Sequence, residues 1–253
     1  MLPKISVIIV THNRAALLLR AIDSVLAQSF KDFELLIVDD DSSDNTEFLV
    51  KAYLIDERVK YFKIQKQKSI AAVRNFVWPY THGKYIAVLD SDDIWIDKDK
   101  LQKQYDFLEK NVDVVLLGAA AVQINEKGVE IGRVAKPLKD EDIKKEFFVK
   151  NPFFHSSVMF RREAITPPFV YDDKISFGED WDLWLRLGEK NKLANLADEL
   201  IAYCVHNNNE AKKHSLKAVL DVFQVIKKHR KCYGKSRMIY IEKIISKLSE
   251  YLR

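Results

Sequence analysis

Three carboxylates stand within four residues in Leu89–Asp93, which reads L-D-S-D-D. The apolar run from Tyr85 to Leu89 predicts a buried strand, because five apolar residues match a strand and are too few for a helix. Asp90 and Asp92, on alternate residues, could direct their carboxylates to one cation just past that strand. Oxygen ligands of this kind suit Mg²⁺ or Mn²⁺ that carries substrate phosphates. The alternative is a turn and helix-capping cluster, since Asp is common in both settings.

Polar side chains also follow two other predicted strands. The run Ile5–Val10 ends in Thr11–Arg14, and Phe33–Val38 ends in Asp39–Asp41. The carboxyl ends of parallel strands lie along one edge of a sheet. So many acids at that edge would repel one another unless a cation or hydrogen-bond donors compensated their charge. A phosphate-bearing ligand with a bound metal would do so, with Arg74 nearby to meet a phosphate or a base.

The elements that position these residues alternate between strand and helix. Apolar residues at three- and four-residue spacings predict helices between the strands. The predicted order is strand 5–10, helix 17–26, strand 33–38, helix 46–53, strand 59–64, helix 69–79 and strand 84–89. This alternation predicts a mainly parallel sheet with helices on both faces. The absence of a G-x-G-x-x-G motif and of a P-loop disfavours a dinucleotide-binding domain and excludes a P-loop NTPase.

After Asp93 the pattern shifts toward antiparallel pieces. Asn125–Gly128 separates two short apolar runs and predicts a hairpin. Glu179 and Asp180 begin a predicted helix at 179–187, where the helix dipole favours carboxylates. The other predicted elements are helices at 98–110 and 140–150, strands at 112–118, 155–160 and 200–205, and two amphipathic tail helices within 216–252 that break around Gly234.

The composition is typical of a globular chain with a substantial core. Of its 253 residues, 47% are hydrophobic and 31% are charged. No apolar run reaches the roughly 18–20 residues of a membrane span, and the N-terminus lacks the pattern of a signal peptide, so a cytoplasmic location is expected. The two cysteines, Cys204 and Cys232, form no disulfide framework and suggest a reducing compartment.

Positive charge is concentrated near the C-terminus. The net charge is +4, but residues 210–253 hold 12 of the 41 Lys/Arg and 4 of the 37 Asp/Glu, so this segment carries +8 and the remainder −4. The segment could be a solvated helical face, could pair two chains into a homodimer, or could place the protein peripherally on the anionic inner face of a membrane. No nucleic-acid partner is expected.

Taken together, these motifs resemble those of the family 2 glycosyltransferases. The resemblance covers residues 4–209, and the matching segments come in the family's order and spacing. The segments are S-V-I-I-V-T-H-N-R within Ile5–Arg14, V-D-D-D-S-S-D-N-T at Val38–Thr46, A-A-V-R-N at Ala71–Asn75, L-D-S-D-D at Leu89–Asp93 and E-D at Glu179–Asp180.

The resemblance implies a GT-A fold, a Rossmann-like α/β domain. Its mainly parallel sheet would be flanked by helices and joined to an antiparallel acceptor-side portion. The domain would occupy residues 1–209, with a nucleotide-sugar half at 1–95 and an acceptor-side half at 96–209. Residues 210–253 would form a basic amphipathic helical tail.

The resemblance also implies a reaction, namely the inverting, metal-dependent transfer of a sugar from a nucleotide-sugar donor, expected to be a UDP-sugar. The acceptor would be a glycan or a lipid-linked glycan in bacterial surface polysaccharide synthesis. Transfer of a single sugar is expected, because the Q-x-x-R-W motif and membrane spans of processive members are absent.

Site roles follow from the same resemblance. Asp180 would be the general base, with Glu179 as its neighbour or an acceptor contact. Asp39 would accept a hydrogen bond from a uracil-like N–H. The residues expected to bind the nucleotide sugar are Thr11, Asn13, Arg14, Asp39, Asp41, Arg74, Asp90 and Ser91, and those expected at Mn²⁺ or Mg²⁺ are Asp92 and His206.

Other residues are expected to serve the structure, and two other functions stay open. Asp93, His12 and His155 are assigned structural roles. Cys204 stands where the family commonly has arginine, which leaves the contact of His206 with the diphosphate open. A non-catalytic nucleotide-sugar-binding scaffold is one alternative. A sugar-phosphate nucleotidyltransferase is another, but it would need a Gly-rich loop after the first strand.

Overall fold

The computed structural model describes residues 2–165, 170–206, 216–229 and 231–233. The strands are β1 (Ile5–Thr11), β2 (Phe33–Asp40), β3 (Val59–Ile64), β4 (Tyr85–Asp90), β5 (Ile94–Trp95), β6 (Val114–Ile124), β7 (Glu130–Val134), β8 (Met159–Arg161) and β9 (Lys192–Cys204). The α-helices are α1 (Ala15–Leu26), α2 (Thr46–Val50), α3 (Ile70–Val77), α4 (Lys100–Lys110), α5 (Asp140–Glu146), α6 (Glu179–Gly188) and α7 (Leu216–His229). Short 3₁₀ helices are η1 (Lys51–Ile55), η2 (Trp78–Tyr80), η3 (His155–Ser157) and η4 (Arg162–Ala164).

The strands form one mixed sheet in the order β3-β2-β1-β4-β8-β6-β9-β5, with β7 beside β6. The predicted parallel arrangement of the first half is confirmed, because β1 pairs in parallel with both β2 and β4, and β2 with β3. From β1 the chain continues to β2 and β3 on one side of β1 and then crosses to its other side as β4. The carboxyl ends of these two strands therefore form a topological switch point, where open α/β sheets bind ligands.

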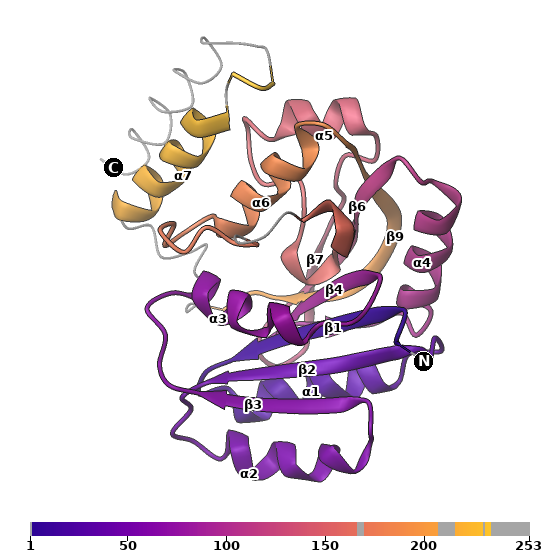
Figure 1. Cartoon of the computed structure of the whole chain (residues 1–253), viewed down its shortest axis with the longest axis vertical. Coiled ribbons are helices and arrows are strands. Elements are labelled where there is room, and N and C mark those ends of the chain that lie inside the picture. Colours follow the sequence, from indigo (N-terminus) through magenta and orange to yellow (C-terminus); the bar gives the residue numbers. More distant parts are fainter. Residues whose placement is uncertain (1, 166–169, 207–215, 230, 234–253) are drawn as a thin grey trace.

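Helices cover both faces of the sheet because the strands bury side chains on both sides. Along β1, Val7 and Ile9 belong to the core packed by α1 and α4, whereas Ile8 and Val10 belong to the core packed by α3, α5 and α6. Alternate residues of a strand point to opposite faces, so a continuous apolar run is what such a doubly covered strand requires. In Figure 1 the indigo and purple N-terminal half lies below and α5, α6 and α7 lie above.

Four predicted boundaries in the second half are wrong. The predicted strand at 155–160 is instead the turn η3 followed by β8, because Ser157 Oγ donates a hydrogen bond to the Phe154 carbonyl and closes a turn. The predicted strand at 200–205 begins at Lys192, since its first half pairs in parallel with β6. The strand predicted at 112–118 continues to Ile124, and the helix predicted at 140–150 ends at Glu146. The predicted hairpin is confirmed as the antiparallel pair β6–β7.

Helix α7 packs against α6, on the same core as the sheet. Val222, Val225 and Ile226 are buried in the cluster that contains Trp184 of α6. No helix within the described part of the chain is both long enough and apolar enough to cross a membrane. The predicted second tail helix and its break at Gly234 lie outside the described residues.

One buried carboxylate joins α6 to α7. Asp182 is fully buried and accepts hydrogen bonds from His229 Nε2 at 2.8 Å, Lys228 Nζ at 2.9 Å and Arg186 Nε at 2.9 Å. We expect Asp182→Ala to lower the free energy of unfolding by about 3 kcal/mol, because it removes a fully buried carboxylate that accepts hydrogen bonds from three side chains, of which His229 is itself buried. Urea denaturation at pH 7 measures the loss. Asp142→Ala, which breaks an exposed pair, is the control and should change it by at most about 1 kcal/mol.

The same carboxylate predicts a pH dependence. Burial opposes ionisation of Asp182, but the hydrogen bonds from His229 and Lys228 and the charge of Arg186 outweigh it and hold its pKa well below the usual range. A lowered carboxyl pKa contributes stability that is present above the unfolded-state pKa of about 4 and is lost as the pH falls below it. The stability gap between wild type and Asp182→Ala should therefore narrow below about pH 4. A gap that stays constant to about pH 2.5 would contradict this assignment.

Candidate functional site

The loops after β1 and β2 are tied together at the switch point. Thr11 and Asp39 are partners in the β1–β2 register. Asn13 adopts a positive φ of 51°, and its side-chain oxygen accepts a hydrogen bond from the Ser43 N–H at 2.8 Å. Asp39 is fully buried and accepts hydrogen bonds from the Ser42 N–H and from the Tyr61 hydroxyl. Thr11 and Asp39, the predicted nucleoside contacts, thus lie side by side at one edge of the sheet.

Asp41 lies apart from these buried contacts. It is exposed and has a positive φ of 63°, so it forms the tip of the turn after β2. Thr11 Oγ1, in contrast, is buried without a hydrogen-bond partner among the described residues. A buried hydroxyl without a partner is uncommon and often marks a place where a ligand or water completes the bonding.

Asp92 lies between two nitrogen-bearing side chains. Its Oδ2 is 2.9 Å from Arg14 Nη1 and 2.7 Å from His206 Nε2. The structure therefore brings the two predicted metal ligands together, although no group of three or more candidate ligands forms within the described residues. A carboxylate with an imidazole suits Mn²⁺ better than Mg²⁺, which prefers an all-oxygen shell. Asp92 and His206 would therefore fit a divalent cation that takes its remaining ligands from elsewhere.

Asp93 holds this region in shape. Its carboxylate is buried and accepts hydrogen bonds from the hydroxyl of Ser156 and, at 2.8 Å, from the backbone N–H of Cys204, two residues before His206. The Ser156 hydroxyl in turn accepts the backbone N–H of Asp90 at 3.1 Å. Burial and the neighbouring carboxylates raise the pKa of Asp93 well above the usual range. Asp93 thus links the turn Asp90–Asp93, called the acidic turn below, to η3 and to the end of β9.

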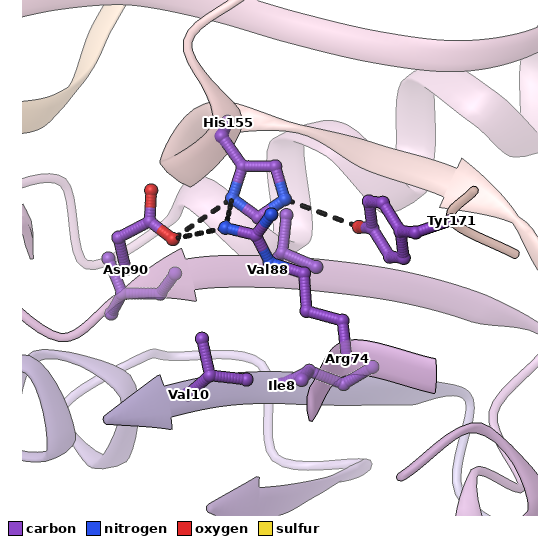
Figure 2. Close-up of a pocket in the computed structure, with 8 residues that line it drawn as sticks. Ile8, Val10, Arg74, Val88, Asp90, His155 and Tyr171 are labelled. Atoms are coloured by element: carbon purple, nitrogen blue, oxygen red, sulfur yellow. Dashed lines mark hydrogen bonds and ion pairs between the residues drawn. The ribbon is translucent and has the colours of Figure 1, made fainter. Parts of the chain in front are cut away.

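Arg74 links the two sides of the site. Its guanidinium is buried, with Nη1 on Glu179 and Nη2 3.0 Å from Asp90 Oδ1. His155 Nδ1 lies 3.1 Å from the same Asp90 oxygen, and its Nε2 lies 3.2 Å from the Tyr171 hydroxyl. Figure 2 shows this chain of side chains around a small pocket. The lining residues are Ile8, Val10, Arg74, Val88, Leu89, Asp90, His155 and Tyr171.

Burial and charge pairing together shift the pKa values of Asp90, Arg74 and Glu179. Burial opposes ionisation of Asp90, but His155 and Arg74 overcome it and hold the pKa of Asp90 below its usual range. Burial also opposes the charge of Arg74, but the charges of Glu179 and Asp90 outweigh it and raise the pKa of Arg74 above its usual value. For Glu179 the balance is reversed: burial raises its pKa, and the charge of Asp180 raises it further, against the opposing effect of Arg74.

Asp180 differs from Glu179 in being accessible. Gly178, with a φ of 86°, ends the preceding loop in a left-handed conformation that glycine adopts without strain, and α6 then begins with these two acids. Glu179 is buried against Arg74, whereas Asp180 is half-buried. Asp180 Oδ2 accepts a hydrogen bond from Asn151 Nδ2 at 2.8 Å. A substrate hydroxyl can therefore reach Asp180 more readily than Glu179.

The site also contains residues that the sequence did not single out. His155, which sequence reasoning treats as structural, contacts Asp90, and Tyr171 and Asn151 contact His155 and Asp180. No local pattern marks Asn151, since Asn151-Pro152 reads as a helix break. Ser91, predicted to bind the donor, is buried in the turn between Asp90 and Asp92.

Comparison with curated proteins gives relatives that are described as glycosyltransferases. The chain is 36% identical over 197 residues to an uncharacterized glycosyltransferase of Rickettsia conorii, covering 78% of this chain but only 32% of that protein. It is 32% identical over 235 residues to an uncharacterized glycosyltransferase of Methanocaldococcus jannaschii, covering 90% of this chain and 80% of the relative. It is 34% identical over 194 residues to the UDP-Glc:alpha-D-GlcNAc-diphosphoundecaprenol beta-1,3-glucosyltransferase WfgD of Escherichia coli, covering 75% and 72%.

Solved structures agree on the fold. S. aureus TarS 1-349 in complex with UDP-GlcNAc superimposes with a TM-score of 0.71 at 20% identity, covering 98% of this chain and 71% of the other. The mannosyltransferase PcManGT from Pyrobaculum calidifontis, in complex with GDP-Man and Mn²⁺, gives 0.68 at 16% identity, covering 98% and 69%. The family model for glycosyl transferase family 2 matches residues 6–166. With this match, and with the Methanocaldococcus relative aligned over most of both chains, the protein belongs to glycosyl transferase family 2 and has the GT-A fold.

Proposed function

We propose that the chain is an inverting, metal-dependent glycosyltransferase that moves one sugar from a UDP-sugar to an acceptor hydroxyl in cell-surface glycan synthesis. The observation that carries the proposal is the two-sided site. Asp90 and Asp92 lie on the acidic turn, Asp180 lies across from them at the start of α6, and Arg74 contacts both Asp90 and Glu179 beside Asp180. Inversion needs this division, because the attacking hydroxyl and the leaving diphosphate stand on opposite sides of the anomeric carbon.

In this proposal Asp180 takes the proton of the acceptor hydroxyl. Its accessibility and its place at the first turn of α6 support that role, because the helix dipole favours a carboxylate there. Asn151 fixes the direction of the carboxylate through its side-chain amide. Glu179 remains paired with Arg74 and keeps that arginine directed at Asp90.

On the donor side, Asp92 and His206 would hold the cation and Arg14 would be released to meet the diphosphate. A bound Mn²⁺ or Mg²⁺ would neutralise the charge that develops on the leaving diphosphate. Arg14 is about one-third exposed, with a side-chain accessibility of 33%, so it can turn from Asp92 to a phosphate without unpacking the core. Asp90, held by Arg74 and His155, would then face the donor sugar or ribose.

The names of the relatives support the donor and acceptor classes. The TarS complex contains UDP-GlcNAc, and WfgD is named for a UDP-glucose donor and a lipid-diphosphate acceptor. A second relative, the O-antigen biosynthesis glycosyltransferase WbnJ of Escherichia coli, is 33% identical over 218 residues. Both oxygens of Asp39 already accept a hydrogen bond, and each keeps a second lone pair that could accept one from a uracil N–H.

A donor screen tests the proposal directly. With Mn²⁺ present, the matching UDP-sugar should raise the melting temperature more than other nucleotide sugars, because a ligand that binds only the folded state stabilises it by mass action. UDP release with that donor and a panel of glycan acceptors should follow. Donor binding without turnover on any acceptor would favour the scaffold alternative. Binding of GDP-sugars in preference to UDP-sugars would refute the assignment of the nucleotide.

A further inference from the structure

We propose that Lys136 forms a subsite for an anionic group, a phosphate or diphosphate, carried by the acceptor sugar. The inference rests on the proposed function, since it uses Asp180 as the base that defines the acceptor position. It concerns the acceptor side of the site, away from the donor diphosphate that Asp92 and His206 would face.

The location of Lys136 is fixed by two contacts, and one of its partners also contacts Asp180. Its Nζ donates a hydrogen bond to the backbone carbonyl of Asn151 at 2.9 Å and lies 4.2 Å from the centroid of the Phe154 ring. The side-chain amide of the same Asn151 donates to Asp180 Oδ2 at 2.8 Å. Asn151 therefore contacts both groups, the ammonium through its backbone carbonyl and the proposed base through its side-chain amide.

The orientation of Asn151 is determined by its bonds. Its Oδ1 accepts the backbone N–H of Phe153 at 3.1 Å, so its Nδ2 must be the atom that faces Asp180. Asn151 is thus fixed at both ends. An acceptor whose hydroxyl binds Asp180 and whose charged substituent binds Lys136 would therefore be held in one defined orientation.

Lys136 also differs from the other cationic side chains near the site. Arg14 pairs with Asp92, Arg74 with Asp90 and Glu179, and Lys150 with Glu146 at 3.0 Å. Within the described residues, the contacts of Lys136 are a carbonyl and an aromatic face, and no carboxylate lies within ion-pair distance. A half-buried ammonium without a counter-ion is unfavourable, and an anionic ligand would remove that cost.

The electrostatics of the neighbourhood agree with this geometry. Burial and the nearby charge of Lys150 lower the pKa of Lys136 to about 8, against the opposing effects of Glu146 and Asp180. At neutral pH the side chain is still mainly protonated, so it can meet a phosphate as a cation. A neutral sugar could accept only an ordinary hydrogen bond from it, whereas a phosphate would also gain the attraction between opposite charges, so the subsite favours anionic acceptors.

A binding comparison on the full chain tests the subsite. The protein is saturated with UDP and Mn²⁺, so that the donor diphosphate position is filled. Octyl N-acetylglucosaminyl diphosphate and the neutral octyl N-acetylglucosaminide are then titrated by calorimetry. The wild type should bind the diphosphate at least about tenfold more tightly, which corresponds to about 1.4 kcal/mol.

Four variants separate charge from positioning. Lys136→Met and Lys136→Gln should abolish the preference, whereas Lys136→Arg should keep it. Glutamine can still donate to the Asn151 carbonyl, so its loss of preference identifies the charge. Lys139→Met, which removes an exposed lysine on the same segment, is the control and should keep the preference.

Equal binding of the two probes by the wild type, or a preference that survives in Lys136→Met, would overturn the inference. A preference in the wild type without sugar transfer from any nucleotide-sugar would support the subsite and remove only the proposed function.

Discussion

Asp180→Asn is expected to slow sugar transfer severely while leaving UDP binding nearly unchanged. The variant keeps the size of the side chain and removes its ability to take a proton. General-base catalysis contributes about 10²–10⁴-fold, so kcat should fall by that factor. The contacts of Asp180 are with Asn151 and the Trp181 N–H, whereas the acidic turn is held by Arg14, Arg74, His155 and Ser156. The donor side should therefore stay intact.

The measurement pairs UDP release with UDP–Mn²⁺ binding on the same preparation. The amide that this substitution introduces would face the amide of Asn151, so a small loss of stability is expected and should be checked by thermal unfolding. Asp198→Asn is the matched control, because it changes an exposed carboxylate that pairs with Lys103. Transfer that survives in Asp180→Asn at the rate of the control would show that another group takes the proton.

Comparing the kinetic effects of Glu179→Gln and Asp180→Asn gives a second check on Asp180 as the base. Glu179→Gln should disturb Arg74, and through it Asp90, since Arg74 contacts both. Its effect should therefore appear in donor affinity as well as in kcat. Asp180→Asn should act on kcat alone.

The N-terminal half of the fold could be predicted from the sequence because its signals are local. Buried strands such as Ile5–Thr11 and Tyr85–Asp90 are mainly apolar, and each ends where polar residues begin. The parallel arrangement then follows from the alternation with helices, and the meeting of Thr11, Asp39 and Asp90 follows from the parallel register.

The second half could not be predicted as well, for two physical reasons. Strand β9 is interrupted by polar residues that face outward, such as Asp198 and Glu199, and its pairing with β6 is irregular, so its first half lacks a clear strand pattern. The segment around His155 owes its shape to contacts with residues far along the chain. His155 meets Asp90 across 65 positions, and Arg74 across 81.

The candidate site shows the same division. Asp90, Asp92 and Arg74 lie on elements whose ends the sequence marks, so their convergence could be foreseen. Asn151 and Tyr171 lie on irregular segments, and contacts with residues far along the chain, such as that of Tyr171 with Asn75, hold them beside Asp180 and His155. Sequence motifs thus mark the residues of the proposed donor side, whereas tertiary contacts bring together those of the proposed acceptor side.

Asp92→Ala is expected to abolish Mn²⁺ binding at the proposed metal site. Asp92 supplies the charged oxygen next to His206, and no third His, Cys, Asp or Glu completes a metal cluster with them in the described parts of the chain. Loss of the carboxylate would leave one imidazole and the diphosphate. Mutation of a residue that hydrogen-bonds a metal ligand typically lowers metal affinity by about 10–100-fold. Loss of the ligand itself should therefore lower Mn²⁺ affinity by at least about 100-fold.

Electron paramagnetic resonance can measure this without turnover, since free Mn²⁺ gives a signal that bound Mn²⁺ loses. In the presence of UDP the wild type should bind Mn²⁺ and Asp92→Ala should not. His206→Ala should weaken binding less, because the diphosphate and water can replace a neutral ligand more easily than a charged one. Asp106→Ala removes an exposed carboxylate of α4 and is the control.

The outcome also distinguishes two roles for Arg14. In the structure Arg14 pairs with the same Asp92 oxygen that approaches His206. If Arg14 only neutralises Asp92 until the metal arrives, Arg14→Gln should tighten Mn²⁺ binding in the absence of UDP. If Arg14 then binds the diphosphate, the same variant should weaken UDP binding. Unchanged Mn²⁺ affinity in Asp92→Ala would refute the metal assignment and leave the acidic turn as a structural cap.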